Sequence, residues 1–147
     1  MNKDKQIKSI VAEIFEIPSP KIDESYRNQI YDFIKTTING DSDIKYYLAI
    51  DVIINQKDGV VIYVLTDKRL IQFEIDADGE IKSGSLILKQ IIGGIVRSLS
   101  ENGTKMEVIL RSHPDVTAGL KYDIKNDKIT KFFEEVEQVL LESKQNG

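Results

Sequence analysis

The sequence predicts an α+β fold in which two helices precede about seven antiparallel strands and a third helix closes the chain. Three observations support this prediction. Up to residue 40, apolar residues recur with the 3.6-residue period of a helix. From residue 41 they recur with the two-residue period of a strand, in segments separated by polar turns. The helical period returns after residue 126. We therefore divide the chain into a helical extension, residues 1–40, and a β-rich domain, residues 41–147.

The bulk properties exclude several classes of protein. At 147 residues the chain has the length of one domain and can bury a sizeable core. It has no cysteine, which excludes disulfides, a thiol nucleophile and thiolate metal ligands and suits a reducing cytoplasm. Its 20 basic and 24 acidic residues are interspersed, so we expect no nucleic-acid surface. The first fifteen residues, MNKDKQIKSIVAEIF, carry scattered charges, unlike a signal peptide or a membrane span. We expect a cytoplasmic protein.

The extension is predicted to form two amphipathic helices. The first covers about residues 4–17 and ends before Pro18, because proline disfavours helical geometry in the residue that precedes it. For the second helix, Ser19 is the predicted N-cap, Pro20 the first helical residue and Asn39-Gly40 the stop. Each helix has an apolar stripe, made by Ile7, Ile10, Val11, Ile14 and Ile17 in the first and by Ile22, Tyr26, Ile30, Phe33, Ile34 and Ile38 in the second. Two helices of this length cannot bury those stripes alone, so we expect them to dock on the domain or on another chain.

The segment from Val60 to Ile75, VVIYVLTDKRLIQFEI, is the clearest strand signal and predicts a hairpin. Two apolar runs flank the turn Thr66-Asp67-Lys68-Arg69. Before it, a strand with Ile44, Tyr46, Leu48, Ile50, Val52 and Ile54 on one face leads to a turn at residues 55–59. After it, residues 76–79 form a further turn in which Gly79 can take a positive φ.

The later strands are marked by their glycines. A strand or strand pair is predicted through Leu86, Leu88 and Ile91, and Gly93-Gly94 predicts a bulge or a sharp bend after it. Asn102-Gly103 is a strong hairpin signal between two further alternating segments. The last helix begins at a cap, Asn126 or Asp127, and buries a wide stripe made by Ile129, Phe132, Phe133, Val136, Val139 and Leu140.

This order of elements resembles the pleckstrin-homology-like (PH-like) superfold, and in particular the bacterial PH-like domains. The resemblance covers about residues 44–142 and rests on the turn Leu65-Thr66-Asp67-Lys68-Arg69-Leu70-Ile71, on the later segment Leu86–Ile92 and on Phe132-Phe133 in the last helix. It implies a partly open antiparallel barrel of about seven strands, capped by the C-terminal helix and preceded by the two N-terminal helices. It also implies a fold that is often used for binding, and some members of the family assemble into rings through strand edges.

We do not expect specific phosphoinositide binding, although the PH-like resemblance suggests it. The lipid-binding members use several basic residues around the first strand turn, whereas that turn here has Lys57 beside Asp58. A polyanionic headgroup needs several convergent cations. Lys68 and Arg69 are adjacent bases in another turn, but a structural role is favoured, in which Arg69 pairs with Asp67 or reaches backbone carbonyls.

No catalytic, cofactor-binding or metal site is predicted. Asp76, Asp78 and Glu80 resemble a calcium loop, but the glycine and the final glutamate of an EF-hand do not fall at the required positions, which favours a hairpin turn. His113 is the sole histidine and is interpreted as a surface-loop residue. The phosphate-binding, dinucleotide-binding and zinc-protease motifs are absent from the sequence. We do not expect an enzyme.

The hypothesis that follows is a non-catalytic interaction or assembly domain, which associates with itself or binds a protein or peptide. A partly open barrel leaves strand edges that must be capped or paired. One alternative is a weak lipid or membrane-surface module, which a cluster of surface bases would favour. The other is a small-ligand pocket protein, which a cavity lined by Tyr46, Tyr63 and Tyr122 would favour.

Overall fold

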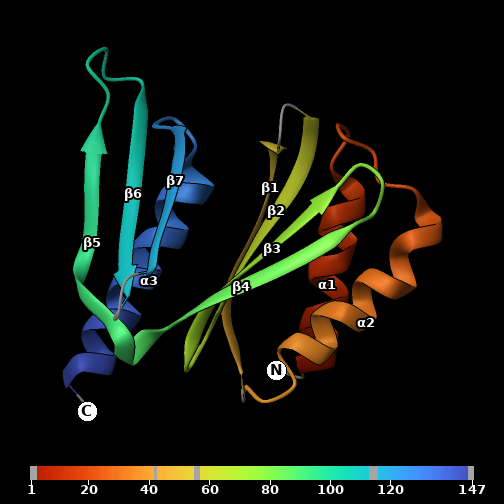
Figure 1. The fold of residues 1–147 in the computed structure, drawn as a ribbon, viewed down its shortest axis with the longest axis horizontal. Coiled ribbons are helices and arrows are strands. Elements are labelled where there is room, and N and C mark those ends of the chain that lie inside the picture. Colours follow the sequence, from red (N-terminus) through yellow and green to blue (C-terminus); the bar gives the residue numbers. More distant parts are fainter. Residues whose placement is uncertain (1–2, 42, 55–56, 113–115, 146–147) are drawn as a thin grey trace. The chain divides into compact units, whose positions relative to one another are not determined.

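The computed structural model describes residues 3–41, 43–54, 57–112 and 116–145 (Figure 1). Within these residues the chain forms three α-helices and seven strands, arranged in two antiparallel sheets. The first sheet has the order β1-β2-β3-β4 and the second the order β5-β6-β7. The predicted α+β class, strand number and C-terminal helix are confirmed. The two sheets do not join into one closed barrel among the described residues, so the finer prediction of a PH-like barrel remains a prediction.

The chain divides into two compact units, Met1–Ser85 and Leu86–Gly147. The first unit contains the N-terminal helices together with the first sheet, and the second contains the other sheet and the C-terminal helix. The segment predicted as an extension, residues 1–40, therefore shares a compact unit with the strands that follow it. None of the described helices combines the length and the apolar character needed to cross a membrane.

The N-terminal helices begin and end where local signals place them, with one exception. Helix α1 covers Lys3–Glu16 and ends before Pro18, as predicted. The prediction that the second helix starts at Pro20 is wrong, because the helical segment begins with a short 3-10 helix, η1, at Glu24–Tyr26. The Asp23 side chain caps it by accepting a hydrogen bond from the Ser25 N–H (2.8 Å). Helix α2 then covers Arg27–Thr37.

The first sheet consists of β1 (Ile44–Ile54), β2 (Lys57–Thr66), β3 (Arg69–Asp76) and β4 (Ile81–Ile87). Strand β1 contains a bulge, because Ile44 lies opposite Thr66 while Tyr46 lies opposite Leu65, which leaves Lys45 as an extra residue. The prediction that Ile44 and Tyr46 share one face is therefore wrong. Ile44 is buried with the helices, whereas Tyr46 is 42% exposed.

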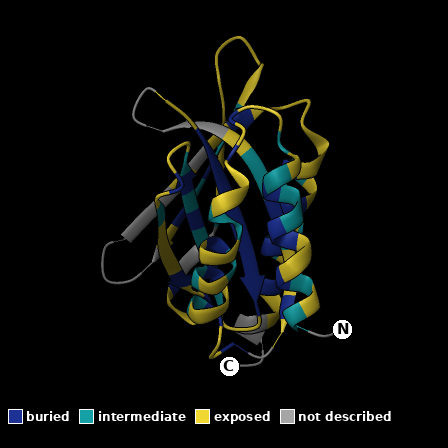
Figure 2. Ribbon diagram, turned by 90° about the vertical axis from the view of Figure 1, so that its right-hand side faces the viewer, coloured by how far each residue is buried: buried dark blue, intermediate teal, exposed yellow. Residues whose placement is uncertain are grey.

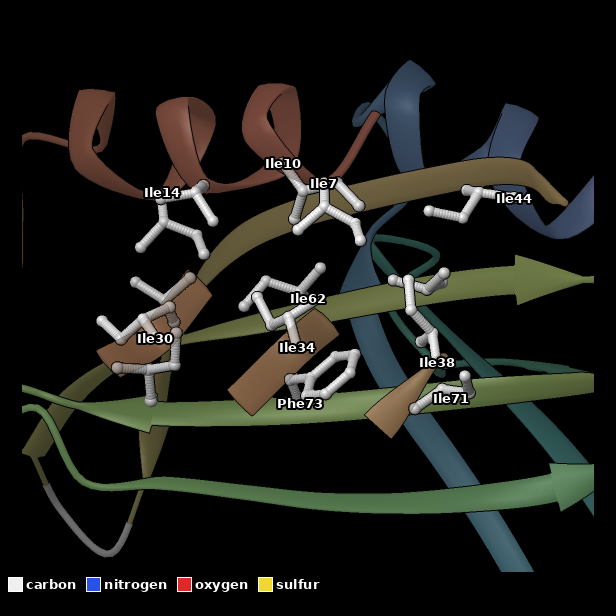
Figure 3. Close-up of a cluster of buried hydrophobic side chains, with 14 of the residues drawn as sticks. Ile7, Ile10, Ile14, Ile30, Ile34, Ile38, Ile44, Ile62, Ile71 and Phe73 are labelled. Atoms are coloured by element: carbon white, nitrogen blue, oxygen red, sulfur yellow. The ribbon is translucent and has the colours of Figure 1, made fainter. Parts of the chain in front are cut away.

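One face of the first sheet is covered by α1 and α2 (Figures 1 and 3). Side chains from both helices meet alternate residues of the central strands, and the Phe33 and Phe73 rings contact edge to face at 6.2 Å. Burial of each large aliphatic side chain contributes roughly 1.5–3 kcal/mol, so this layer is a main source of stability. The helices thus bury their stripes on the chain's own sheet. The core is made by Ile7, Ile10, Ile14, Ile30, Ile34, Ile38, Ile44, Ile62, Ile71 and Phe73, among others.

The second sheet consists of β5 (Ile91–Leu99), β6 (Lys105–Ser112) and β7 (Val116–Asp123). The predicted strand through Leu88 is interrupted by a 3-10 turn, η2, at Leu88–Gln90. The predicted bulge at Gly93-Gly94 is confirmed, because Ile92 lies opposite Arg111 and Val96 lies opposite Ile109. Three residues of β5 therefore face one residue of β6. The predicted turn at Asn102-Gly103 joins β5 to β6, and Gly103 has φ 71°.

Helix α3 covers Asp127–Gln145 and provides the apolar layer of the second unit. Its predicted cap is confirmed as Asn126, whose side-chain oxygen accepts from the Ile129 N–H at 3.2 Å. Phe132 and Phe133 are both buried, and the Phe133 ring stacks on Tyr122 of β7 with a centroid distance of 6.5 Å. The helices show buried residues on one side and exposed residues on the other (Figure 2). The predicted stripe of α3 is the buried one.

Candidate interaction surface at a sheet edge

The turn that carries the family resemblance, Thr66–Arg69, is part of a polar network in the first unit. The Thr66 hydroxyl oxygen accepts hydrogen bonds from the backbone N–H groups of Lys68 and Arg69, each at 3.2 Å, and so shapes the turn. The Arg69 guanidinium points toward the helical layer. Its Nε lies 3.1 Å from both carboxylate oxygens of Asp41, and a terminal nitrogen donates to the Thr37 carbonyl. The predicted structural role of Arg69 is confirmed, with Asp41 in place of Asp67 as its ion-pair partner.

The same network holds the C-terminal end of α2. The Lys3 ammonium donates to the carbonyl oxygens of Ile38 (3.3 Å), Asn39 (3.2 Å) and Asp41 (2.6 Å). Burial opposes ionisation of the Asp41 carboxyl, but hydrogen bonds from Arg69 and Thr66, together with nearby positive charge, outweigh it and lower the pKa of Asp41. These cations satisfy helix-end carbonyls that would otherwise lack partners. The motif therefore fastens the helical layer to the sheet.

The basic residues considered for a lipid headgroup are far apart. Lys57 is the first residue of β2, and Lys68 follows the end of that strand at Thr66. A strand rises about 3.3 Å per residue, so the two ends of β2 are separated by about 30 Å. This distance argues against a shared headgroup site for Lys57 and Lys68. Residues 57–59 of the turn predicted at 55–59 belong to strand β2, because Lys57 already pairs with Ile54, and residues 55 and 56 lie outside the described residues.

The acidic turn between β3 and β4 uses its first carboxylate to shape the backbone. The Asp76 side chain accepts hydrogen bonds from the N–H groups of Asp78 (3.0 Å) and Glu80 (2.9 Å). Gly79 adopts φ 81°, as predicted, and the Tyr26 ring lies directly against it. The hairpin-turn interpretation is confirmed. Among the described residues, no group of three or more His, Asp or Glu side chains is placed to hold a metal ion.

The remaining residues that the sequence analysis considered for a binding site are His113 and the three tyrosines of the possible ligand cavity. His113 lies outside the described residues. Tyr46 and Tyr63 belong to the first unit, on the sheet face opposite the helices, where burial and then the charge of Glu74 raise the pKa of Tyr63 to about 12. Tyr122 belongs to the second unit and stacks on Phe133.

The arrangement best suited to binding is the outer edge of β5. No strand of the described chain pairs with this edge, because β5 is the first strand of its sheet. The Ser100 N–H donates to the Lys105 carbonyl at 2.9 Å. With the register of the two strands, this hydrogen bond shows which residues of β5 direct their backbone groups toward β6. Alternate residues of an antiparallel pair direct both backbone groups to the partner strand. Within the continuous register from Val96 to Leu99, the N–H and C=O groups of Arg97 and Leu99 therefore point away from β6.

Two apolar side chains along this edge are exposed. Val96 is 51% exposed and Leu99 is 52% exposed, on opposite faces of the strand. Arg97 lies on the face covered by α3 and forms an ion pair with Glu137 at 2.7 Å. One turn away on the same side of α3 lies Leu141, which is 51% exposed. We call this surface the β5 shelf: Ile95–Leu99 with the adjoining flank of α3, Glu134, Glu137 and Leu141. The sequence analysis did not single it out, although the run IIGGIVRSL has a single charge.

Comparisons with known proteins give a similarity of fold alone. No protein-family model matches the sequence, and no curated protein sequence matches it. The structure is similar to the crystal structure of the C-terminal domain of an unknown protein from Leishmania infantum, with a TM-score of 0.50 and 13% sequence identity. The match covers 78% of this chain and 97% of that domain. At this identity the likeness concerns the α+β architecture.

Proposed function

We propose that this protein is a non-catalytic, cytoplasmic interaction or assembly domain of the PH-like type, and that it binds an extended protein segment by strand addition to β5. The observation that carries the proposal is the direction of the Arg97 and Leu99 backbone groups, away from β6. A strand laid along them gains main-chain hydrogen bonds, while side chains on either face supply selectivity.

The PH-like barrel is part of this proposal. The face of the first sheet that α1 and α2 do not cover is also apolar, with Leu48, Val61, Tyr63, Leu65 and Leu70. An apolar sheet face needs a second layer to cover it. The order of seven strands and a final helix, together with the Thr66–Arg69 turn, supports membership of the bacterial PH-like domains.

The other edges whose side chains are described are less suited to strand addition. At the start of β1 the ladder is bulged, and the Gln6 amide donates to the Ile44 carbonyl at 2.9 Å. Bulges and covered edges are the means by which proteins prevent edge pairing. Strand β4 exposes the polar stretch Lys82–Ser85. By contrast, β5 exposes Val96 and Leu99 and has one charge, which Glu137 already neutralises.

The test compares the wild-type chain with Leu99→Pro and Leu99→Thr. Proline removes one N–H that points outward, so the β5–β6 ladder is kept while the edge is blocked. Threonine removes the same apolar side chain but keeps the N–H. The assay is fluorescence polarisation with a library of labelled nine-residue peptides of alternating apolar and polar residues.

We expect a subset of peptides to bind the wild type, to bind Leu99→Thr more weakly and to lose binding to Leu99→Pro. Binding that is equal in all three chains would place the peptide elsewhere and contradict strand addition at β5. A library without any binder would contradict the proposal as well, provided that self-association has been excluded by light scattering.

A further inference from the structure

We infer that Asn39-Gly40, in the turn that follows α2, is a site of spontaneous covalent modification, where the Asn39 amide is lost and an aspartyl or isoaspartyl residue forms. This inference does not depend on strand addition at β5. It follows from the free reacting groups of Asn39-Gly40, from the restrained groups of the matched sequence Asn102-Gly103, and from the contact between Lys3 and the Asn39 carbonyl.

The reaction joins the asparagine side chain to the backbone of the next residue. The Gly40 nitrogen loses its proton to hydroxide and attacks Asn39 Cγ, so that an N–C bond forms. The bond between Cγ and Nδ2 then breaks, and the leaving nitrogen takes a proton from water and departs as ammonia. Water opens the cyclic succinimide: at Cγ it gives aspartate, and at the backbone carbonyl carbon it gives isoaspartate. Water is consumed and ammonia is released, and glycine favours the attack because it has no Cβ to hinder it.

The turn after α2 leaves both reacting groups free. The Asp41 N–H donates to the Ile38 carbonyl at 3.1 Å, so Asn39 and Gly40 are the two central residues of this turn. Both are exposed, which gives water access to them. Among the described residues, no hydrogen bond restrains the Asn39 side-chain amide or the Gly40 N–H. The side chain can therefore turn toward the Gly40 nitrogen without breaking a hydrogen bond of the fold.

The second Asn-Gly sequence of the described chain is equally exposed, but its reacting groups are restrained. Oδ1 of Asn102 accepts hydrogen bonds from the Ser100 hydroxyl (2.7 Å), the Thr104 hydroxyl (2.7 Å) and the Thr104 N–H (3.2 Å). The Gly103 N–H donates to the Ser100 carbonyl at 2.9 Å. Attack on Cγ requires these hydrogen bonds to break, so the fold protects Asn102. Asn146-Gly147 lies outside the described residues.

The ammonium group of Lys3 favours the reaction at Asn39. It donates to the Asn39 carbonyl at 3.2 Å. When the Gly40 nitrogen loses its proton, the negative charge is shared with that oxygen, because the peptide bond has partial double-bond character. The end of a helix disfavours negative charge, but Lys3 offsets this effect, since it also donates to the carbonyls of Ile38 (3.3 Å) and Asp41 (2.6 Å). A positive charge thus lies at the oxygen where the anion forms.

The modification alters the connection between α2 and the first sheet. Isoaspartate adds a methylene group to the main chain directly before Gly40 and Asp41. The Asp41 carboxylate is buried and pairs with Arg69, so a displaced Asp41 weakens the network that fastens the helical layer. Aspartate keeps the length of the main chain, and we expect it to have the smaller effect. The isoaspartyl chain should therefore unfold at a lower urea concentration than the unmodified chain.

The first test follows both sequences by peptide mass spectrometry while the full chain is kept in mildly alkaline buffer. In the folded chain we expect Asn39 to lose its amide at least about tenfold faster than Asn102, a difference of about 1.4 kcal/mol in activation free energy. In urea the restraining hydrogen bonds are absent, so the two rates should become similar. Equal rates in the folded chain, or a difference that persists unchanged in urea, would overturn the inference.

The variant Gly40→Ala tests the site without disturbing the fold. A Cβ at Gly40 would meet no atom within 4 Å, and the residue lies outside the left-handed region. The methyl group hinders the attack, so amide loss at Asn39 should slow by about tenfold or more while Asn102 in the same chain keeps its rate. Wild type that has been aged should contain an isoaspartyl form with lowered stability, and aged Gly40→Ala should not. Amide loss at Asn39 that is equally fast in Gly40→Ala, or an isoaspartyl form as stable as the unmodified chain, would count against the inference.

The role of Lys3 is tested by Lys3→Met, with Lys3→Arg as the matched control that keeps the charge. Lys3→Met should slow amide loss at Asn39 by about threefold or more, because the anion on the Asn39 carbonyl loses its cation. Lys3→Arg should stay close to the wild-type rate, and neither variant should change the rate at Asn102. An unchanged or faster reaction in Lys3→Met would show that Lys3 does not assist the modification.

Discussion

The structure makes a sharp prediction for Arg69, the last residue of the turn on which the family resemblance rests. Replacing it with methionine keeps much of the side-chain volume but removes the guanidinium. Asp41, whose side chain is 6% exposed, would then keep the Thr66 hydroxyl but lose its ion pair, and the Thr37 carbonyl would lose its donor. Removing one partner of a buried ion pair typically costs 3–5 kcal/mol. Because Arg69 is itself 24% exposed, we expect about 3 kcal/mol.

A loss of that size is a large share of the total stability of a domain of this length, about 5–15 kcal/mol. At about 2–4 °C per kcal/mol, the melting temperature should fall by roughly 6–12 °C. The measurement is urea unfolding followed by circular dichroism, with Lys68→Met as the matched control, since Lys68 is the exposed base beside Arg69. The control should stay within about 0.5 kcal/mol of wild type. If Arg69→Met is no less stable than Lys68→Met, the network does not fasten the helical layer.

The pH dependence of the same variant follows from Asp41. The pKa of Asp41 is lowered in the folded chain, so its ionised form stabilises the fold above the ordinary carboxyl pKa of about 3.9. That contribution is lost as the pH falls below this value through the folded-state pKa. We therefore expect the difference in unfolding free energy between wild type and Arg69→Met to be full at neutral pH and to shrink below about pH 4. A difference that stays constant down to pH 2 would contradict the role given to the carboxylate.

Further predictions concern the two cores, one turn and lipid binding. Phe133→Ala should cost about 3–5 kcal/mol in thermal or urea unfolding, whereas Leu141→Ala, on the exposed side of α3, should cost less than about 1 kcal/mol. Gly79→Ala should destabilise by about 1–3 kcal/mol, because φ is 81° and a Cβ would lie 2.6 Å from the Tyr26 ring; Gly103→Ala, with φ 71° and open space, should cost less. Deleting residues 1–40 should uncover the helix-facing core of the first sheet, which increased binding of a hydrophobic dye would report. Liposome sedimentation at physiological salt should show no preference for one phosphoinositide; strong headgroup selectivity would contradict the argument from the separated bases.

Most of the elements could be predicted because their signals are local. The helical period of α1 and α3, the glycines at the turns and the bulge, and the cap at Asn126 each act within a few residues. The predicted start of α2 was wrong because the sequence contains two competing local signals. Pro20 could occupy the first helical position, but the structure instead uses Asp23 as the cap of a 3-10 helix. Such competition is decided by packing, which a single sequence does not display.

Features that depend on contacts between segments far apart in the sequence could not be predicted. The face on which Ile44 lies changes with the bulge in its pairing with β2, and the period of β1 alone does not contain that information. The partner of Arg69 is Asp41, 28 residues earlier in the chain. The edge position of β5 depends on the order of strands in its sheet, so the β5 shelf has only a weak sequence signal, a nearly uncharged strand.

The Thr66–Arg69 turn, on which the family resemblance rests, and the β5 shelf therefore have different roles. Thr66–Arg69 fastens α1 and α2 to the first sheet, and with those helices in place α1 reaches β1 through Gln6 at Ile44 and Glu13 at Tyr47. The Gln6 contact covers one backbone carbonyl of this edge strand, which is otherwise rich in apolar residues. For β5, the described side-chain contacts show the ion pair between Arg97 and Glu137 but no hydrogen bond to a backbone group of its outer edge. A bulged and partly covered β1 edge together with an unpaired β5 edge is the arrangement expected if an extended segment is added to β5 rather than to β1.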